Sequence, residues 1–314
     1  MSTILNYPRS VAAAYGNTGQ PSANVSLDKL VGLILTTDGY EIPLASLATW
    51  EDALAYLQDS TLAPNKKDRA FPVMFVEGLT DNTPEANKVM SGYGNIKKIV
   101  ENPFQASAEM ENLGIEWFKN LRKFKDMKNL RGYWVDTTFI GGELTSTGLK
   151  GFECSFMVGN PKIGNGKDST TDYAAAIEFR NPTALTDDIN VIVYPKGVNI
   201  KNELFGCLDV ELSSPTLNVV KAVEKISKVD MYDNYADELA VVGAWVATDS
   251  LTGRAIAISG VAKNTTYKGW TITHAAATGD TIITLASPDV LAGLNVGSAT
   301  AGGYEAESGV SLGE

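Results

Sequence analysis

The segment LRGYWVDTTFIGGELTSTGLKGFECSFMVGN, residues 130–160, sets the pattern for most of this chain. Stretches rich in β-branched and aromatic residues alternate in it with short stretches rich in Gly, Thr and Ser, which is typical of strands joined by turns. Further strand-like segments are LVGLILTTDG (30–39), FPVMFVEGL (71–79), AAAIEFR (174–180), INVIVYPKG (189–197) and LDVELS (208–213). Many short strands with few helices predict a mainly β (α+β) fold, an antiparallel β-sandwich or barrel. The segment NVVKAVEKISKV (218–229) fits a helix and a strand equally well.

Two helices are expected, near residues 50–58 and 108–125. In the first, Trp50, Leu54 and Leu57 fall on one face. In the second, apolar residues recur every three or four positions and form one stripe, made of Met110, Leu113, Trp117, Leu121 and Phe124. Acidic residues begin this segment and basic residues end it, which suits the helix dipole. We therefore expect an amphipathic helix that flanks the sheet.

The domain organisation expected from the sequence is an arm followed by two domains. Residues 1–25 are rich in Ser, Ala, Asn, Gly and Pro, which indicates a flexible N-terminal arm. Residues 26–235 would form the barrel domain. In residues 236–314, alternating segments are separated by turns about ten residues apart, which predicts a small immunoglobulin-like β-sandwich. Trp245 or Trp270 would occupy its core.

Composition excludes some classes of function. The 314 residues include 26 Lys and Arg against 37 Asp and Glu, a formal net charge of −11. Sequence-independent binding of nucleic acid needs many cations near phosphates, so it is not expected here. Apolar runs such as VGLIL at 31–35 are far too short to span a membrane. The first residues, MSTILNYPRS, lack a charged region followed by an apolar one, so no secretory signal is expected.

Two cysteines, Cys154 and Cys207, and a single histidine, His274, restrict the chemistry. A zinc site built from Cys and His needs about four ligands, so none is expected. The cysteines are expected to be reduced, and whether they form one bridge stays open. A catalytic triad based on His274 would lack the serine of a G-x-S-x-G turn. We expect this histidine to pack or to lie in a turn.

Three other groups of residues raise functional hypotheses. The loop GNPKIGNGKDST (159–170) does not match a phosphate-binding loop, because Pro161 stands five residues before Gly166 and Asp168 follows Lys167. A basic cluster is expected to be a solvated helix face, with contact to nucleic acid or to an acidic partner surface as the alternative; it consists of Lys119, Arg122, Lys123, Lys125, Lys128 and Arg131. Nothing marks two carboxylates as an acid–base couple, including the pairs Asp187 with Asp188 and Glu305 with Glu307. No catalytic, cofactor-binding or metal-binding residue is predicted, and no enzyme is expected.

Residues 85–193 resemble the tail tube (major tail) proteins of tailed bacteriophages, particularly those that infect Bacteroidetes hosts. The resemblance rests on four segments in a fixed order, SGYGNIKKIVENPF (91–104), WFKNLRKFKDMKNLRGYWVD (117–136), GGELTSTGLKGFECSFMVGNPK (141–162) and YAAAIEFRNPTALTDDINVIV (173–193). It implies a β-barrel flanked by a helix, of which six copies join their inner sheets into a ring. Stacked rings would form a tube for genome delivery, and an acidic chain suits a lumen that must not bind DNA. Immunoglobulin-like domains are common C-terminal additions in this family, and the family implies no catalytic residue.

The expected function is therefore that of a structural virion protein of the phage tail, made in the host cytoplasm. Its expected partners are other copies of itself and the tape measure, sheath, neck or baseplate proteins, without specific nucleic-acid or membrane binding. The loop 159–172 and the N-terminal arm are candidates for contacts between rings. One alternative is another virion component, such as a head decoration, capsid or neck protein. Another is a surface- or carbohydrate-binding module that uses exposed aromatic side chains, namely Trp245, Trp270 or Tyr304.

Overall fold

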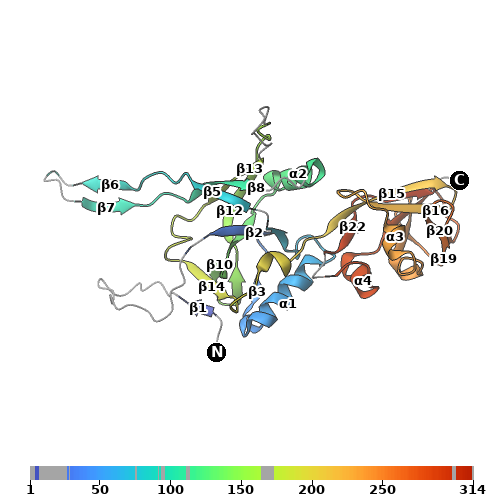
Figure 1. Cartoon of the computed structure of the whole chain (residues 1–314), viewed down its shortest axis with the longest axis horizontal. Coiled ribbons are helices and arrows are strands. Elements are labelled where there is room, and N and C mark those ends of the chain that lie inside the picture. The colour runs from blue at the N-terminus through green and yellow to red at the C-terminus, as the bar shows by residue number, and fades with distance from the viewer. Residues whose placement is uncertain are drawn as a thin grey trace. The chain divides into compact units, whose positions relative to one another are not determined.

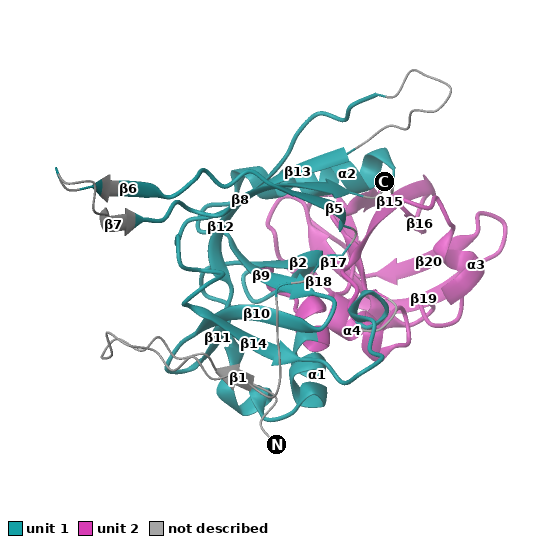
Figure 2. Cartoon of the chain, turned by 60° about the vertical axis from the view of Figure 1, so that its left-hand side comes forward, with its two compact units in different colours: residues 1–57, 67–203 teal, residues 58–66, 204–314 magenta. Residues whose placement is uncertain are grey.

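The computed structural model describes residues 4–6, 27, 29–74, 76–90, 92, 96–110, 114–163, 173–298 and 302–312. The described chain is mainly β, with largely antiparallel sheets and few helices, so the predicted fold class is confirmed. It divides into two compact units, shown in Figure 2: unit 1 holds residues 1–57 and 67–203, and unit 2 holds residues 58–66 and 204–314. The division at residue 204 differs from the expected boundary at 236, because two strands between these positions contribute to the core of unit 2.

Unit 1 is organised around strand β9 (Arg131–Asp136), whose last five residues are all buried. One edge of β9 pairs with β2 (Leu30–Thr36) along its whole length. The other edge is shared by β12 (Phe152–Val158) at the start of β9 and by β10 (Phe139–Leu144) at its end. The sheet therefore forks at β9 and continues in two directions.

The first branch of the sheet curls into a half-barrel. Beyond β12 it continues with β13 (Tyr173–Phe179), β8 (Gln105–Met110) and β5 (Val76–Asp81), all antiparallel. On the far side of β2 lies β4 (Phe71–Val73). Only two residues separate β4 from β5. The last strand of the branch, β5, therefore lies near β4 and β2, on the other side of β9, and the sheet is curled. The predicted strand at 71–79 is thus two strands.

The second branch of the sheet leads to the N-terminus. Beyond β10 it continues with β14 (Ile189–Val193) and β1 (Ile4–Asn6), and β11 (Gly148–Lys150) joins β10 to β3 (Ile42–Pro43). The flexible arm expected over 1–25 is therefore partly a strand, since Ile4 pairs with Ile192. The rest of that arm, residues 1–3 and 7–25, lies outside the described residues.

Helix α2 (Ile115–Arg122) and the 3₁₀ turn η2 (Lys123–Asp126) close the core of the half-barrel. Phe118 of α2 packs against Tyr173 with ring centroids 4.6 Å apart. The predicted flanking helix is thus present, but it begins at Ile115 and not near 108. Residues 105–110 belong to β8, where every second residue is buried. Gly114, with a φ of 94°, directly precedes the helix, because glycine tolerates this backbone conformation.

Helix α1 (Trp50–Thr61) overlaps the first expected helix, and the short turns η1 (Leu44–Leu47) and η3 (Ile200–Asn202) accompany it. Thr49 caps α1, because its Oγ1 accepts the N–H of Asp52 at 3.1 Å. Trp50 packs on Tyr194 with ring centroids 4.7 Å apart, which ties the start of α1 to the end of β14.

Unit 2 is a sandwich of two sheets. One has the strand order β19-β20-β16-β15-β22 and the other β18-β17-β21-β23, and β15 with β22 is a parallel pair. The strands are β15 (Leu208–Thr216), β16 (Val219–Glu224), β17 (Trp245–Asp249), β18 (Ala255–Ile256), β19 (Ile258–Asn264), β20 (Gly269–His274), β21 (Thr281–Leu285), β22 (Tyr304–Ala306) and β23 (Val310–Leu312). The ambiguous segment 218–229 thus contains a strand. The helices are α3 (Met231–Tyr235), η4 (Val242–Ala244) and α4 (Pro288–Gly293). Trp245 and Trp270, from opposite sheets, lie 5.5 Å apart in the shared core.

Candidate assembly interface

The strands β12, β13, β8 and β5 of unit 1 form a layer with one buried and one exposed face. Along β12 the burial alternates, so that Phe156 lies in the core while Met157, 52% exposed, lies on the opposite face. Met157 is in register with Ala176 of β13, which is in register with Ser107 of β8. We call this exposed side of the layer the outer face; it consists of Thr80, Gln105, Ser107, Glu109, Glu153, Ser155, Met157, Ala174, Ala176 and Glu178. Its side chains are mostly small or acidic.

The β5 edge of this layer has no partner strand among the described residues. β5 ends the sheet and pairs with β8 alone. The N–H of Asn82, one residue past β5, donates to the carbonyl of Gln105 at 2.8 Å. Because the direction of hydrogen bonding alternates along an antiparallel strand, the N–H groups of Leu79 and Asp81 point to the open side. This edge can pair with a strand of another chain.

The β12 edge has no partner strand among the described residues beyond Cys154, whose N–H donates to the carbonyl of Leu130 at 3.0 Å. The turn η2 packs against this part of β12, with the ring centroids of Phe124 and Phe156 6.4 Å apart. β12 pairs with β9 only through Phe152 and Glu153, whereas its residues up to Val158 pair with β13 on the other side. The N–H of Gly159 donates to Ala174 of β13, so the N–H groups of Phe156 and Val158 point to the open side. One layer thus carries an open edge at each of its two sides.

All charged side chains on the four strands of the layer are acidic. Its four strands contain no Lys or Arg and five carboxylates, those of Glu77, Asp81, Glu109, Glu153 and Glu178. Arg180, directly after β13, forms an ion pair with Glu153. The outer face is therefore negative, and it is hollowed only shallowly, by a depression of about 240 Å³ beside Met157 and Glu178. An acidic face whose strands contain no Lys or Arg repels nucleic acid and other polyanions.

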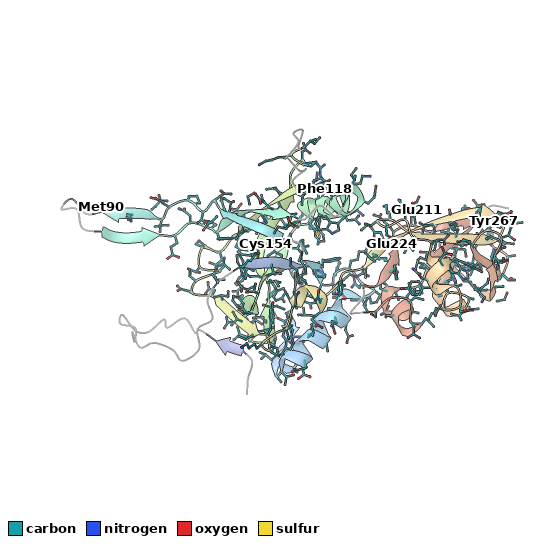
Figure 3. All side chains as sticks on the ribbon, viewed as in Figure 1. Met90, Phe118, Cys154, Glu211, Glu224 and Tyr267 are labelled. Atoms are coloured by element: carbon teal, nitrogen blue, oxygen red, sulfur yellow. The ribbon has the colours of Figure 1, made fainter. Side chains whose placement is uncertain are left out.

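A two-stranded hairpin of unit 1 forms a sheet of its own. It consists of β6 (Asn87–Met90) and β7 (Ile96–Val100), and Figure 1 shows it extending away from the rest of unit 1. Met90, labelled in Figure 3, is 58% exposed, and Val100 is 40% exposed. An isolated two-stranded hairpin with exposed apolar side chains gains little stability by itself. It is suited to contact another molecule.

The predicted basic cluster is divided by the structure. Arg131 lies on β9, where its Nε donates to Asp38 at 2.6 Å. Hydrogen bonds from Arg131 and from Lys150 lower the pKa of Asp38. Lys119 pairs with Glu116, three residues before it on α2, at 2.7 Å. The remaining four residues of the cluster are exposed on α2, η2 and the turn that follows, namely Arg122, Lys123, Lys125 and Lys128. Arg131 therefore stabilises the fold and is not part of the exposed helix face.

No protein-family model matches this chain, and no match was found among curated proteins. In the part of the chain that the structure describes, no three His, Cys, Asp or Glu side chains are grouped to hold a metal ion. No helix of the described ranges is both long and apolar enough for a membrane span.

The two cysteines and the histidine are buried or hydrogen-bonded within the fold. Neither Cys154 nor Cys207 forms a disulfide with a described residue. Burial among apolar side chains raises the pKa of Cys154 to about 12, so its thiol is unreactive at neutral pH. The thiol of Cys207 donates to the carbonyl of Thr61 at 3.2 Å, within unit 2. The ring of His274 lies 2.8 Å from the carbonyl of Ala275 and 3.3 Å from the hydroxyl of Thr281, so it joins β20 to β21.

The aromatic residues considered for sugar binding are not displayed on the surface. Trp245 and Trp270 are 4% and 0% exposed, and their indole N–H groups donate to carbonyls of Leu239 and Ala236. Tyr304 is half-buried against Tyr235, with ring centroids 5.5 Å apart. The indole rings thus have no free face for stacking on a sugar.

The acidic pairs considered for catalysis are held by different partners. Asp188 accepts a hydrogen bond from Asn181 and another from Thr183. In unit 2, Glu305 pairs with Lys66 and Glu307 with Lys225. The residues Gly166, Lys167 and Asp168 of the rejected phosphate loop lie outside the described residues.

The open edges and the hairpin are not evident from the sequence. The alternation of Ala106, Ala108 and Met110 is the sequence signal that indicates β8.

Proposed function

We propose that this protein is a structural subunit that assembles with copies of itself into stacked rings and forms the tail tube of a bacteriophage, a conduit for genome delivery. The sequence resemblance supports this function, and so does the mainly β fold with one flanking helix. The observation that carries it is the layer β12-β13-β8-β5 with an open edge on each side. Two different edges on one molecule favour head-to-tail association, which closes into a ring when the rotation between copies allows it.

Strand direction favours such a ring. Because the four strands alternate in direction, β5 runs antiparallel to β12. A neighbouring copy related by rotation about an axis along the strands would place its β12 antiparallel to β5 of the first copy. The antiparallel ladder would then continue from copy to copy without a change of direction. The proposed seam joins the N–H groups of Leu79 and Asp81 to the open edge of β12 in the next copy.

In the proposed ring the outer face lines the channel. Its carboxylates, among them Glu109 and Glu178, would give the channel wall a negative charge, and none of the four strands carries a compensating Lys or Arg. DNA that passes along such a wall is repelled and is not held. The small side chains Ala174, Ala176 and Ser107 leave the passage unobstructed.

The hairpin β6–β7 is the proposed contact between rings. It extends from the layer that would form the ring (Figure 1), and it presents Met90 to the solvent. A neighbouring ring that covered Met90 and Val100 would remove their apolar surface from water, which favours stacking.

Negative-stain electron microscopy of the untagged, full-length protein over a concentration series tests the proposal. We expect rings with a central channel, and stacks of rings at higher concentration. Particles that stay monomeric at all concentrations would contradict the proposed function. The carbohydrate-binding alternative is not favoured, because the indole rings it requires are buried.

A further inference from the structure

The basic residues at the end of α2 and in η2 form a local cationic surface on an acidic chain. Residues 122–128, which we call the basic segment, contain the exposed side chains of Arg122, Lys123, Lys125 and Lys128 and one exposed carboxylate, that of Asp126. Neither Lys125 nor Lys128 forms an ion pair with a described residue. The charge of this segment is therefore available to a partner, although the whole chain has a net charge of −11.

Two contacts place the basic segment beside the open edge of β12. The carbonyl of Leu130, two residues past the segment, accepts the N–H of Cys154 at 3.0 Å. Within the segment, the ring of Phe124 packs on Phe156 of β12 with centroids 6.4 Å apart. Because Phe156 faces the core, η2 lies on the core side of the layer, opposite the outer face. The cations thus border the β12 edge on its core side.

The other open edge of the layer carries the opposite charge. Residues 77–85, which we call the acidic segment, include most of β5 and contain the exposed carboxylates of Glu77, Asp81 and Glu85. The chain has no Lys or Arg from residue 70 to residue 87. The carboxylate of Asp81 accepts the N–H of Thr83 at 2.8 Å, which holds it at the end of β5.

The register of the sheet brings these two segments to the same level and the same side. Residues directly opposite in an antiparallel pair project to one face. Asp81 is in register with Ala106, then with Ile177 and finally with Phe156, so it projects to the core side. A neighbouring copy related by rotation about an axis along the strands, without a shift, keeps this level. Its Asp81 then lies opposite Phe156 and next to Phe124 of the basic segment.

We infer that charge specifies the seam between copies, with the acidic segment of one copy paired with the basic segment of the next. This inference rests on the proposed function and names the side chains that orient the contact. The partner is a second copy because the two segments border the two open edges of one layer and are complementary in charge, which favours the correct partner and register. Two β5 edges would meet with like charges, so a symmetric dimer through β5 is disfavoured.

Charge reversal in the full-length protein tests the inference. The first variant, Lys125→Glu with Lys128→Glu, makes the basic segment negative, and the second, Glu77→Lys with Asp81→Lys, makes the acidic segment positive. Each variant alone brings like charges together at every seam. We therefore expect each to associate about tenfold more weakly than the wild type at low salt, in sedimentation velocity, and to form no rings in electron micrographs.

A mixture of the two variants gives the sharpest outcome. In a ring in which the variants alternate, every seam again joins an acidic to a basic segment, so we expect an equal mixture to restore the rings. The matched control, Lys196→Glu with Arg254→Glu, makes the same change in net charge at exposed positions outside both segments and should still form rings. Circular dichroism reports whether each variant is folded.

The outcomes separate this inference from the proposed function. Rings at wild-type yield from either variant alone, or a mixture of folded variants without rings, would overturn the inference while rings of the wild type still support the tube. A wild type that does not associate would overturn both. Salt gives a second measurement that needs no variant: association of the wild type should weaken as salt rises from about 0.05 M to about 0.5 M. An association unaffected by salt would also overturn the inference.

Discussion

The carboxylate of Asp249 accepts a 2.6 Å hydrogen bond from the backbone N–H of Thr278, which lies 29 residues further along the chain. The same side chain also accepts the N–H groups of Leu251, Thr252 and Gly279. These hydrogen bonds favour the ionised carboxylate and lower the pKa of Asp249 far below its ordinary value of 3.8. One carboxylate thus joins the loop after β17 to the loop before β21.

Substitution of Asp249→Asn should loosen these two loops at neutral pH. An amide keeps one acceptor oxygen but turns an N–H₂ group toward backbone donors, so some N–H groups lose their partner. We expect faster amide hydrogen exchange in residues 250–253 and 278–279, measured by mass spectrometry.

The pH dependence of the wild-type protein gives an independent check. A depressed pKa in the folded state stabilises unit 2 at all pH values above 3.8, and this contribution is lost as the pH falls below 3.8 toward the folded-state pKa. The difference in exchange between the wild type and Asp249→Asn should therefore shrink as the pH falls through this range. A difference that stays constant from pH 7 to pH 2 would contradict the role assigned to the carboxylate.

Proline at position 79 should block assembly without unfolding unit 1. The N–H of Leu79 points to the open edge of β5, so Leu79→Pro keeps the ladder with β8 and removes a donor from the proposed seam. We expect rings to be absent in electron micrographs while the circular dichroism spectrum is retained. Leu79→Val, which keeps the N–H, should still form rings. Rings of normal yield from Leu79→Pro would exclude β5 from the seam.

Reversal of charge on the outer face should make the channel bind DNA. The double variant Glu109→Lys with Glu178→Lys places cations on two strands that have none, and the resulting binding should weaken steeply as salt is raised. Retention of duplex DNA by assembled protein, measured in a sedimentation assay at low salt, should be seen for this variant and not for the wild type. Glu211→Lys with Asp289→Lys changes the net charge equally on unit 2 and should retain no DNA. Equal retention by both double variants would place the acidic face outside the channel.

Alanine at position 32 should destabilise unit 1. A Cβ on Gly32 would lie 2.3 Å from the carbonyl oxygen of Val73 and 2.7 Å from the Cα of Met74, where the backbones of β2 and β4 approach closely. We expect Gly32→Ala to lower the free energy of unfolding of unit 1 by about 1–3 kcal/mol, the usual cost of overpacking. Gly39→Ala is the control, because nothing lies within 4 Å of its Cβ, and its effect should stay below about 1 kcal/mol. Urea denaturation followed by circular dichroism measures both.

Much of the fold follows from local sequence patterns. The alternation in β12 and β13 and the continuous burial of β2 each match a strand pattern that is visible in the sequence. The start of α2 was predicted too early, because Met110 and Leu113 fit the spacing of the helical stripe although Met110 belongs to β8. The spacing of apolar residues does not distinguish the two-residue repeat of a strand from the 3.6-residue repeat of a helix where one is followed closely by the other. Gly114, with a φ of 94°, directly precedes α2.

The remaining features depend on contacts between distant segments. The pairing of Ile4 with Ile192 joins residues from opposite ends of unit 1, and no local pattern specifies it. β15 and β16 contribute Val210 and Val220 to the core of unit 2, although a sequence boundary at 236 assigns them to the barrel. An open strand edge is likewise defined by which strands do not pair, and this is known only once the topology is known.

The separateness of the hairpin β6–β7 has a consequence for how this protein changes over evolutionary time. Its strands pair only with each other, and Met90 and Val100 are exposed, so substitutions there remove little core packing from unit 1. Selection on stability is therefore weak in the hairpin and strong in the half-barrel. The hairpin can therefore change to match a different partner while the core packing of the half-barrel stays intact.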